Sequence, residues 1–200
     1  MNMYVIINED MYSDGLWEIG IKRSGFAYAS PELAVLINPI YETFDHPRIF
    51  EASGEMNDPM RSDGEFTLLR ETYVPEFTLV QRQWFAIQCA LAVCDDPVFV
   101  SWANAWINGT DRSSKTAQIV SGKFWADHAT RATHVAVADA AANAAACAVD
   151  ISDAAYAANA TILAADAAYY AAEVNPSINF TDIAANALNF DLKEFQEIDF

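Results

Sequence analysis

The chain is short of cationic residues, and this deficit is its strongest global signal. Only 11 of its 200 residues are Lys or Arg, against 28 Asp or Glu, which gives a formal net charge of −17. Residues 1–80 hold 14 acidic and 5 basic residues, and residues 81–200 hold 14 and 6. Binding nucleic acid or an anionic membrane requires cationic contacts, so we expect neither as a direct partner. A surface negative throughout serves solubility and also attracts basic partner proteins.

Cysteines are also few, and long apolar runs are absent. The three cysteines are Cys89, Cys94 and Cys147, an odd number with no CxxC pair, which argues against a disulfide framework. The first ten residues lack the basic region and cleavage site of a signal peptide. No continuous apolar run approaches the roughly 20 residues that cross a bilayer. The sequence therefore predicts free thiols, no membrane contact and a cytoplasmic location.

Motifs that hold a metal, a cofactor or a nucleophile are missing as well. There is no Walker loop, Rossmann fingerprint, nucleophile elbow or zinc-ligand spacing. His128 and His134 are six residues apart and fall on different faces of a helix, unlike the i, i+4 pair of a helical zinc site. We expect no metal and no cofactor, and the sequence favours a protein without enzymatic activity.

Short β-rich runs and turns fill residues 1–80. Strands are predicted at residues 3–7, 16–21, 25–28 and 48–52, with one or two more within 66–80. One short helix interrupts them, with Ser30 as its N-cap, Pro31 at its first position and its end before Pro39. This part should form a small, mostly antiparallel sheet.

Helical patterns dominate residues 81–200. One helix carries Trp84, Ile87 and Leu91, and a second opens at Asp96-Pro97 and stops at Asn108-Gly109. Residues 126–187 contain 26 alanines in 62 positions, which predicts long helices with breaks near 149–153 and 175–177. The expected fold class is α+β, with an alanine-rich helical bundle after the sheet. No flexible linker separates residues 1–80 from 81–200, so we expect one cooperative unit.

Close helix packing is predicted for residues 152–174. On a helical wheel Ala158 and Ala165 share a face opposite a strip of Tyr and Leu side chains. Small side chains let two helix backbones approach more closely than the usual 8–10 Å. We therefore expect alanines such as these in the contacts between helices.

Two sets of residues are candidates for a site. Acids at helical repeats could form rows that imitate the phosphates of a DNA duplex, or simply a solvated face. Four tryptophans within 42 residues could fill the core, or line a pocket and stack on a base or ring. The acidic rows are Asp166 with Glu173 and Asp139 with Asp150; the tryptophans are Trp84, Trp102, Trp106 and Trp125.

Residues 3–55 resemble an uncharacterised domain found in phage genomes and scattered bacteria. The resemblance is carried by Asn8-Glu9-Asp10-Met11, by Ser24-Gly25-Phe26 with the following Ser30-Pro31-Glu32-Leu33-Ala34-Val35-Leu36, and by Phe50-Glu51-Ala52-Ser53-Gly54-Glu55. Family members place a His after the Gly-Phe pair and a Cys soon after, where this chain has Ala27 and Ala29. In phage relatives alanine-rich segments often follow. The same Gly-Phe and Ser-Pro-Glu pieces more faintly resemble ADP-ribosyltransferase folds.

Two functions remain open at this stage. The first is a phage-type accessory protein that binds and inhibits a host protein with a basic surface, in the host cytoplasm, through an acidic DNA-mimicking surface. The alternative is a nucleotide or small-molecule binding protein, similar to a degenerate ADP-ribosyltransferase, with a Trp-lined pocket. The oligomeric state stays open in both.

Overall fold

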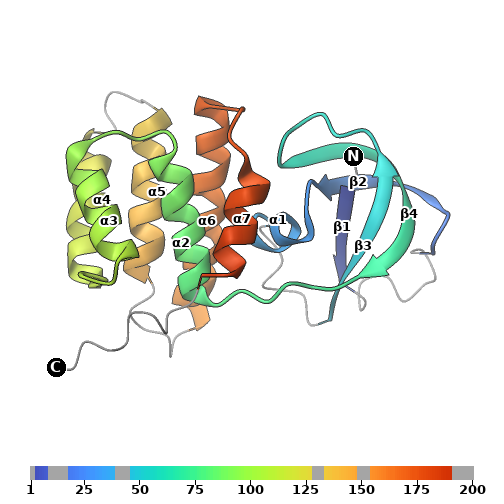
Figure 1. Cartoon of the computed structure of the whole chain (residues 1–200), viewed down its shortest axis with the longest axis horizontal. Helices are drawn as coiled ribbons and strands as arrows, with labels where there is room; N and C mark the ends of the chain where they lie inside the picture. Colours follow the sequence, from blue (N-terminus) through green and yellow to red (C-terminus); the bar gives the residue numbers. More distant parts are fainter. Residues whose placement is uncertain (1–2, 9–17, 39–45, 128–132, 148–153, 191–200) are drawn as a thin grey trace. The chain divides into compact units, whose positions relative to one another are not determined.

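The computed structural model describes residues 3–8, 18–38, 46–127, 133–147 and 154–190, with only the backbone described for 125–127, 133–135, 147 and 154–158. Helix is the most frequent secondary structure of the described residues, and strand is the second. The strands form a four-stranded antiparallel sheet in the N-terminal half, and most of the helices follow it (Figure 1). This mixed composition is the one predicted.

The sheet closes into a barrel, whereas the sequence predicted only a small sheet. Its strands are β1 (Met3–Asn8), β2 (Lys22–Tyr28), β3 (Pro47–Gly54) and β4 (Arg61–Thr72), in the order β1-β2-β4-β3. β1 pairs with β3 along its whole length and meets β2 at a single pair, Tyr4 with Tyr28. Buried side chains that alternate along the strands fill the barrel, in the way that a two-residue period requires. They are Met3, Val5, Ile7, Ala27, Phe50, Ala52, Phe66 and Leu68.

The strand boundaries differ from the predicted ones in two places. Residues 18–21 are not a strand, residues 16–17 lie outside the described part, and one strand, β2, covers residues 22–28. Gly20 adopts a φ of +85° in the turn before β2. β4 begins at Arg61 rather than 66 because Asp58 accepts hydrogen bonds from the backbone N–H groups of Met60 and Arg61, which fixes the preceding turn.

The short helix α1 (Pro31–Leu36) confirms the predicted cap. Ser30 Oγ accepts a hydrogen bond of 3.2 Å from the Leu33 backbone N–H, and Pro31 occupies the first turn. All six residues of α1 are buried, including Glu32. The carboxylate of Glu32 accepts a 2.5 Å hydrogen bond from the Tyr73 hydroxyl. This bond gives the buried carboxylate a hydrogen-bond partner.

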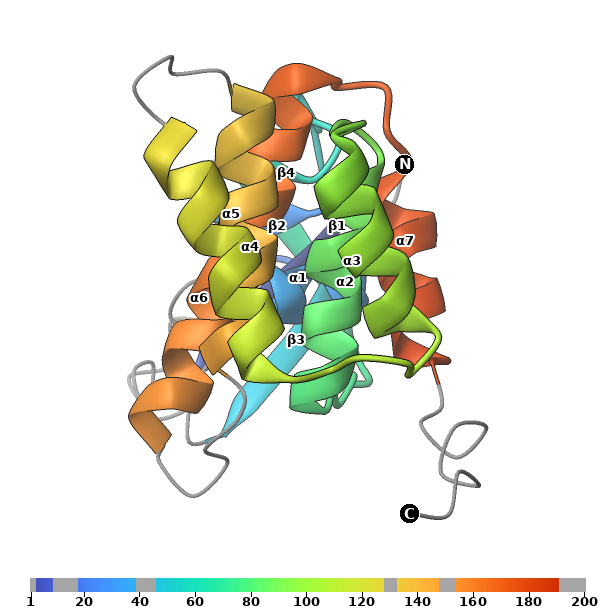
Figure 2. The same ribbon diagram turned by 90° about the vertical axis from the view of Figure 1, so that its left-hand side faces the viewer.

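Six helices follow. They are α2 (Leu79–Leu91), α3 (Pro97–Ile107), α4 (Ser114–Asp127), α5 (Thr133–Cys147), α6 (Ala154–Val174) and α7 (Phe180–Leu188). Thr78 and Gln81 form a capping box before α2, and the Asp96 side chain caps α3, as predicted. Gly109, with a φ of +79°, follows the end of α3. Figure 2 shows α4, α5 and α6 side by side, with α2 and α3 next to them.

Most of the buried residues of α5 and α6 are alanines, among the side chains that the structure describes. Ala165 is buried as predicted, and the side chain of Ala158 lies outside the described residues. Larger side chains of α6 stay at the margins, since Ile162 is 43% exposed and Leu163 is half-buried. The fully buried alanines of α6 are Ala160, Ala164, Ala167, Ala168 and Ala171. Helix α6 thus packs on a stripe of methyl groups, which permits close backbone approach.

The chain divides into two compact units. The first, called the barrel unit below, comprises Met1–Glu76 with Asn179–Ala185, and the second, the helical unit, comprises Phe77–Ile178 with Asn186–Phe200. Each is described by itself. Cys89 and Cys94 of the helical unit are buried free thiols, and burial raises the pKa of both. The side chain of Cys147 lies outside the described residues.

Candidate functional site

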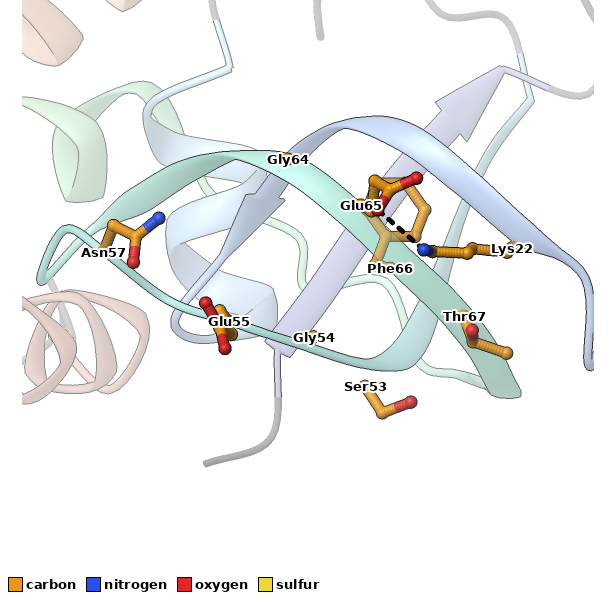
Figure 3. A pocket seen from close by; sticks show the side chains of 9 residues that line it. All are labelled: Lys22, Ser53, Gly54, Glu55, Asn57, Gly64, Glu65, Phe66 and Thr67. Atoms are coloured by element: carbon orange, nitrogen blue, oxygen red, sulfur yellow. Dashed lines mark hydrogen bonds and ion pairs between the residues drawn. The ribbon is translucent and has the colours of Figure 1, made fainter.

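The barrel unit carries a polar hollow of about 440 Å³ (Figure 3). The end of β3 and the residues after it form one wall, and β4 with the start of β2 forms the other. Polar side chains line both walls: Lys22, Ser53, Glu55, Asn57, Glu65 and Thr67. The one aromatic residue there, Phe66, is 2% exposed and belongs to the barrel core, so the hollow offers no ring on which a base could stack.

Two glycines shape the hollow in opposite ways. A Cβ on Gly54 would lie 2.7 Å from the Glu65 backbone oxygen and 2.9 Å from Met3 Sδ. Glycine at position 54 therefore permits the close approach of β3 and β4 that forms the floor of the hollow. A Cβ on Gly64 would meet nothing within 4 Å, so this position has room for a larger residue.

The charges in the hollow are nearly balanced. Lys22 Nζ donates a 2.6 Å hydrogen bond to Glu65 Oε2, and Glu55 adds one further negative charge. A phosphate group would have to compete with Glu65 for Lys22 and approach Glu55, so the hollow does not favour a nucleotide. It suits a small polar group that is neutral or cationic.

The other cations of the barrel unit are also engaged. Arg48 and Arg70 each donate two hydrogen bonds to one carboxylate, that of Glu71 and Glu51 respectively, and lower the pKa of each. The Arg61 guanidinium lies 4.3 Å from the centre of the Phe26 ring. Three of the four arginines in the described part of this unit are thus held by a carboxylate or a ring of the same unit.

The helical unit carries an apolar groove of about 580 Å³ between α3 and α4. These helices run antiparallel, because Lys123 near the end of α4 bonds to Asp96, the N-cap of α3, at 2.9 Å. Val98 is 47% and Ile119 is 64% exposed along the groove, although both are large apolar residues. The sequence did not indicate that either residue is exposed. Val98 is one of several apolar residues in α3, and the α4 segment has no clear amphipathic period.

The four tryptophans have different surroundings. Trp102 lines the α3–α4 groove, is 5% exposed and has an indole N–H without an acceptor among the described residues. Trp84 stacks on Phe190 at 5.5 Å between ring centres. Trp106 is buried, with the Arg112 guanidinium 4.9 Å from its ring. The side chain of Trp125 lies outside the described residues. Of the tryptophan side chains that are described, Trp102 is the one shown to line the α3–α4 groove.

The acids of the two predicted rows differ in how deeply they are buried. Asp139 is buried and accepts hydrogen bonds from Ser121 and Asn143, so it belongs to the contact between α4 and α5 rather than to an exposed row. Its partner in that row, Asp150, lies outside the described residues. Glu173 is exposed, and Asp166 is half-buried, with its pKa raised by burial.

No group of three or more His, Cys, Asp and Glu side chains suited to a metal ion occurs among the described residues. None of the helices in the described ranges is long and apolar enough to cross a bilayer. Comparison with known proteins finds no matching family model, no matching curated protein and no matching solved structure. Function must therefore be argued from the charges, the hollow and the groove.

Proposed function

We propose that this chain is a binding protein that attaches to and inhibits a partner protein with a basic surface. The observation that carries the proposal is the excess of 17 negative charges, combined with a barrel unit in which Arg48, Arg61 and Arg70 are held by the unit's own carboxylates and rings. The acids left over include exposed ones in both units, such as Asp63, Glu76, Asp95 and Glu173. Such carboxylates attract and orient a cationic surface.

A phage origin would make the partner a bacterial host protein. The sequence pieces that resemble a phage domain support this source, and a host protein that binds DNA would offer the required basic surface. Mimicry of DNA would then use exposed acids on α6, with Glu173 as the first candidate and Asp166 beside it at a spacing of seven. Asp139 has no part in it, since it is buried.

Affinity capture from a bacterial lysate tests the proposal. The immobilised chain should retain one or a few basic proteins at low salt, identified by mass spectrometry. The double variant Asp95→Asn, Glu173→Gln should retain clearly less, because two of the exposed charges are gone. A control that keeps the charge, Gln118→Ala with Asn159→Ala on exposed positions of α4 and α6, should retain as much as the parent. Capture of acidic proteins, or equal capture by the neutralised variant, would contradict the proposal.

A small-molecule binding protein is the second candidate, and the surroundings of Trp102 favour it. The groove volume falls within the roughly 300–1,000 Å³ usual for ligand pockets. A nucleotide bound there should change tryptophan emission, because its base would lie against the indole. Titration with ATP and NAD, in the parent and in Trp102→Phe, decides between the candidates: unchanged emission in both proteins leaves the partner-binding proposal standing alone.

A further inference from the structure

The apolar groove between α3 and α4 has the residue spacing of a surface that receives a helix. Its α3 wall follows positions i, i+1, i+4, i+5 and i+8, and its α4 wall follows i, i+3 and i+4, so each wall is one continuous stripe. The α3 wall is Pro97, Val98, Ser101, Trp102 and Ala105, and the α4 wall is Thr116, Ile119 and Val120. Two neighbouring helices with parallel apolar stripes form a groove in which a third helix, an amphipathic one, can bind.

Large apolar side chains on this groove face water. Ile119 is 64% exposed and Val98 is 47% exposed, whereas Val120 and Trp102 between them are buried. Covering Val98 and Ile119 would remove their apolar surface from water, which is favourable. Binding of an occupant with apolar side chains in the groove would therefore be favourable.

The charge of the residues that line the groove indicates which charged residue the occupant would carry. Asp111 is the one charged residue that lines it, and none of the lining residues is cationic. Asp111 accepts hydrogen bonds from the Ser113 backbone N–H at 2.9 Å and the Thr116 hydroxyl at 2.8 Å. Both donors are neutral, so they hold the carboxylate in place without cancelling its charge. A Lys or Arg at the edge of the occupant would complement Asp111.

From these observations we infer that the α3–α4 groove is the docking site for an amphipathic helix of a partner protein, with apolar side chains between Val98 and Ile119 and a Lys or Arg beside Asp111. This inference rests on the proposed function and names its contact surface. Charge alone would let a basic partner bind anywhere on an acidic protein, whereas the groove selects basic segments that are also amphipathic.

Two synthetic peptides test the docking site. The first has 18 Leu and Lys residues arranged so that leucines fall at i, i+3, i+4 and i+7. The second has the same composition in an order that gives no apolar face. Both carry a fluorescent label, and their affinities for the full chain are measured by anisotropy at low and high salt. The groove variants are Val98→Ser and Ile119→Ser, and the matched control is Ile162→Ser, on a 43% exposed residue of α6 that does not line the groove.

The parent should bind the amphipathic peptide at least about tenfold more tightly than the permuted one, the difference expected from burying one apolar side chain. Each groove variant should lose about tenfold for the amphipathic peptide alone, Asp111→Asn should lose about threefold, and Ile162→Ser should bind as the parent does. Circular dichroism should confirm that all the variants fold, since the substituted side chains of Val98, Ile119 and Ile162 are exposed.

Three results would overturn the docking site: no binding of the amphipathic peptide, equal binding of both peptides, or unchanged binding by both groove variants. Equal, salt-sensitive binding of both peptides would leave the basic-partner function intact and remove only the groove. Failure of both peptides, together with failure of lysate capture, would remove both proposals.

Discussion

The Ser121 hydroxyl oxygen lies 2.7 Å from Oδ1 of Asp139, and this pair joins α4 to α5 inside the helical unit. Asn143, one turn further along α5, donates its side-chain amide to the same carboxylate at 2.9 Å and brings its own oxygen 2.7 Å from Ser121. A carboxylate that the sequence suggested for an exposed binding row is thus part of a buried polar cluster. Such clusters set the register of helices whose alanine faces could slide past each other.

Removing the carboxyl group should therefore affect stability and not binding. Asp139→Ala leaves the donors of the buried Ser121 and the half-buried Asn143 with fewer partners, and should lower the free energy of unfolding by about 1–3 kcal/mol in urea. Glu173→Gln, on an exposed position, should stay within about 0.5 kcal/mol of the parent. A parent-like midpoint for Asp139→Ala would mean that the cluster does not stabilise the α4–α5 contact.

The alanine stripe of α6 gives a second stability test. Ala165 is 3% exposed, so Ala165→Leu forces three extra carbons into a filled contact and should destabilise by about 1–3 kcal/mol. Asn159→Leu introduces the same side chain at an exposed position of the same helix and should have a much smaller effect. Equal melting temperatures for Ala165→Leu and the parent would contradict close packing at this position.

The two glycines of the barrel hollow form a matched pair. Gly54→Ala places a carbon 2.7 Å from the Glu65 backbone oxygen, which obliges β3 and β4 to separate, and should destabilise the barrel unit by about 1–3 kcal/mol. Gly64→Ala meets open space and should be neutral or slightly stabilising, because glycine weakens a strand interior. Chemical denaturation followed by circular dichroism measures both. Identical effects would show that the approach of the strands does not depend on Gly54.

Local signals in the sequence predicted the helix starts well. Ser30 with Pro31 and Asp96 with Pro97 each act within three or four residues, so their caps follow from chemistry that a short window contains. The barrel did not follow from the sequence, because its closure depends on which strands pair, and in the described residues β1 pairs with β2 at one position, Tyr4 with Tyr28. The two-residue alternation within a strand does not show which distant strand it pairs with.

The candidate site was less predictable than the fold for a related reason. Helical spacing placed Asp139 on a row, but the wheel of one helix does not show which face a neighbouring helix covers. Conversely, the sequence of α3 alone does not show that the apolar residue Val98 lies at the surface, and the structure shows it 47% exposed. The shortage of cationic residues is visible in the sequence alone. The structure adds that Arg48 and Arg70 are paired with carboxylates of the same unit.

The contact between Tyr73 and Glu32 makes a prediction for alkaline pH. Tyr73 is 57% exposed, but partial desolvation of its hydroxyl and the bond to the Glu32 carboxylate raise its pKa to about 12, from an ordinary value of about 10. Because the folded-state pKa is the higher one, this group stabilises the fold fully below about pH 10 and loses its contribution as the pH rises through about 12. Absorbance at 295 nm, as the difference between the parent and Tyr73→Phe, should show a titration near pH 12. Glu32→Gln should move it toward 10, and a midpoint near 10 in the parent would contradict the contact.

The salt dependence of partner binding tests the central claim most directly. A basic partner protein, once captured and purified, is titrated with the chain at salt concentrations from about 50 to 500 mM, a range over which the screening length falls from about 14 to 4 Å. Attraction between exposed carboxylates and a cationic surface predicts that the dissociation constant rises at least about tenfold across this range, and less for Asp95→Asn, Glu173→Gln. A dissociation constant that stays the same from the lowest to the highest salt would contradict the account, because the negative charge of the chain would then have no part in recognition.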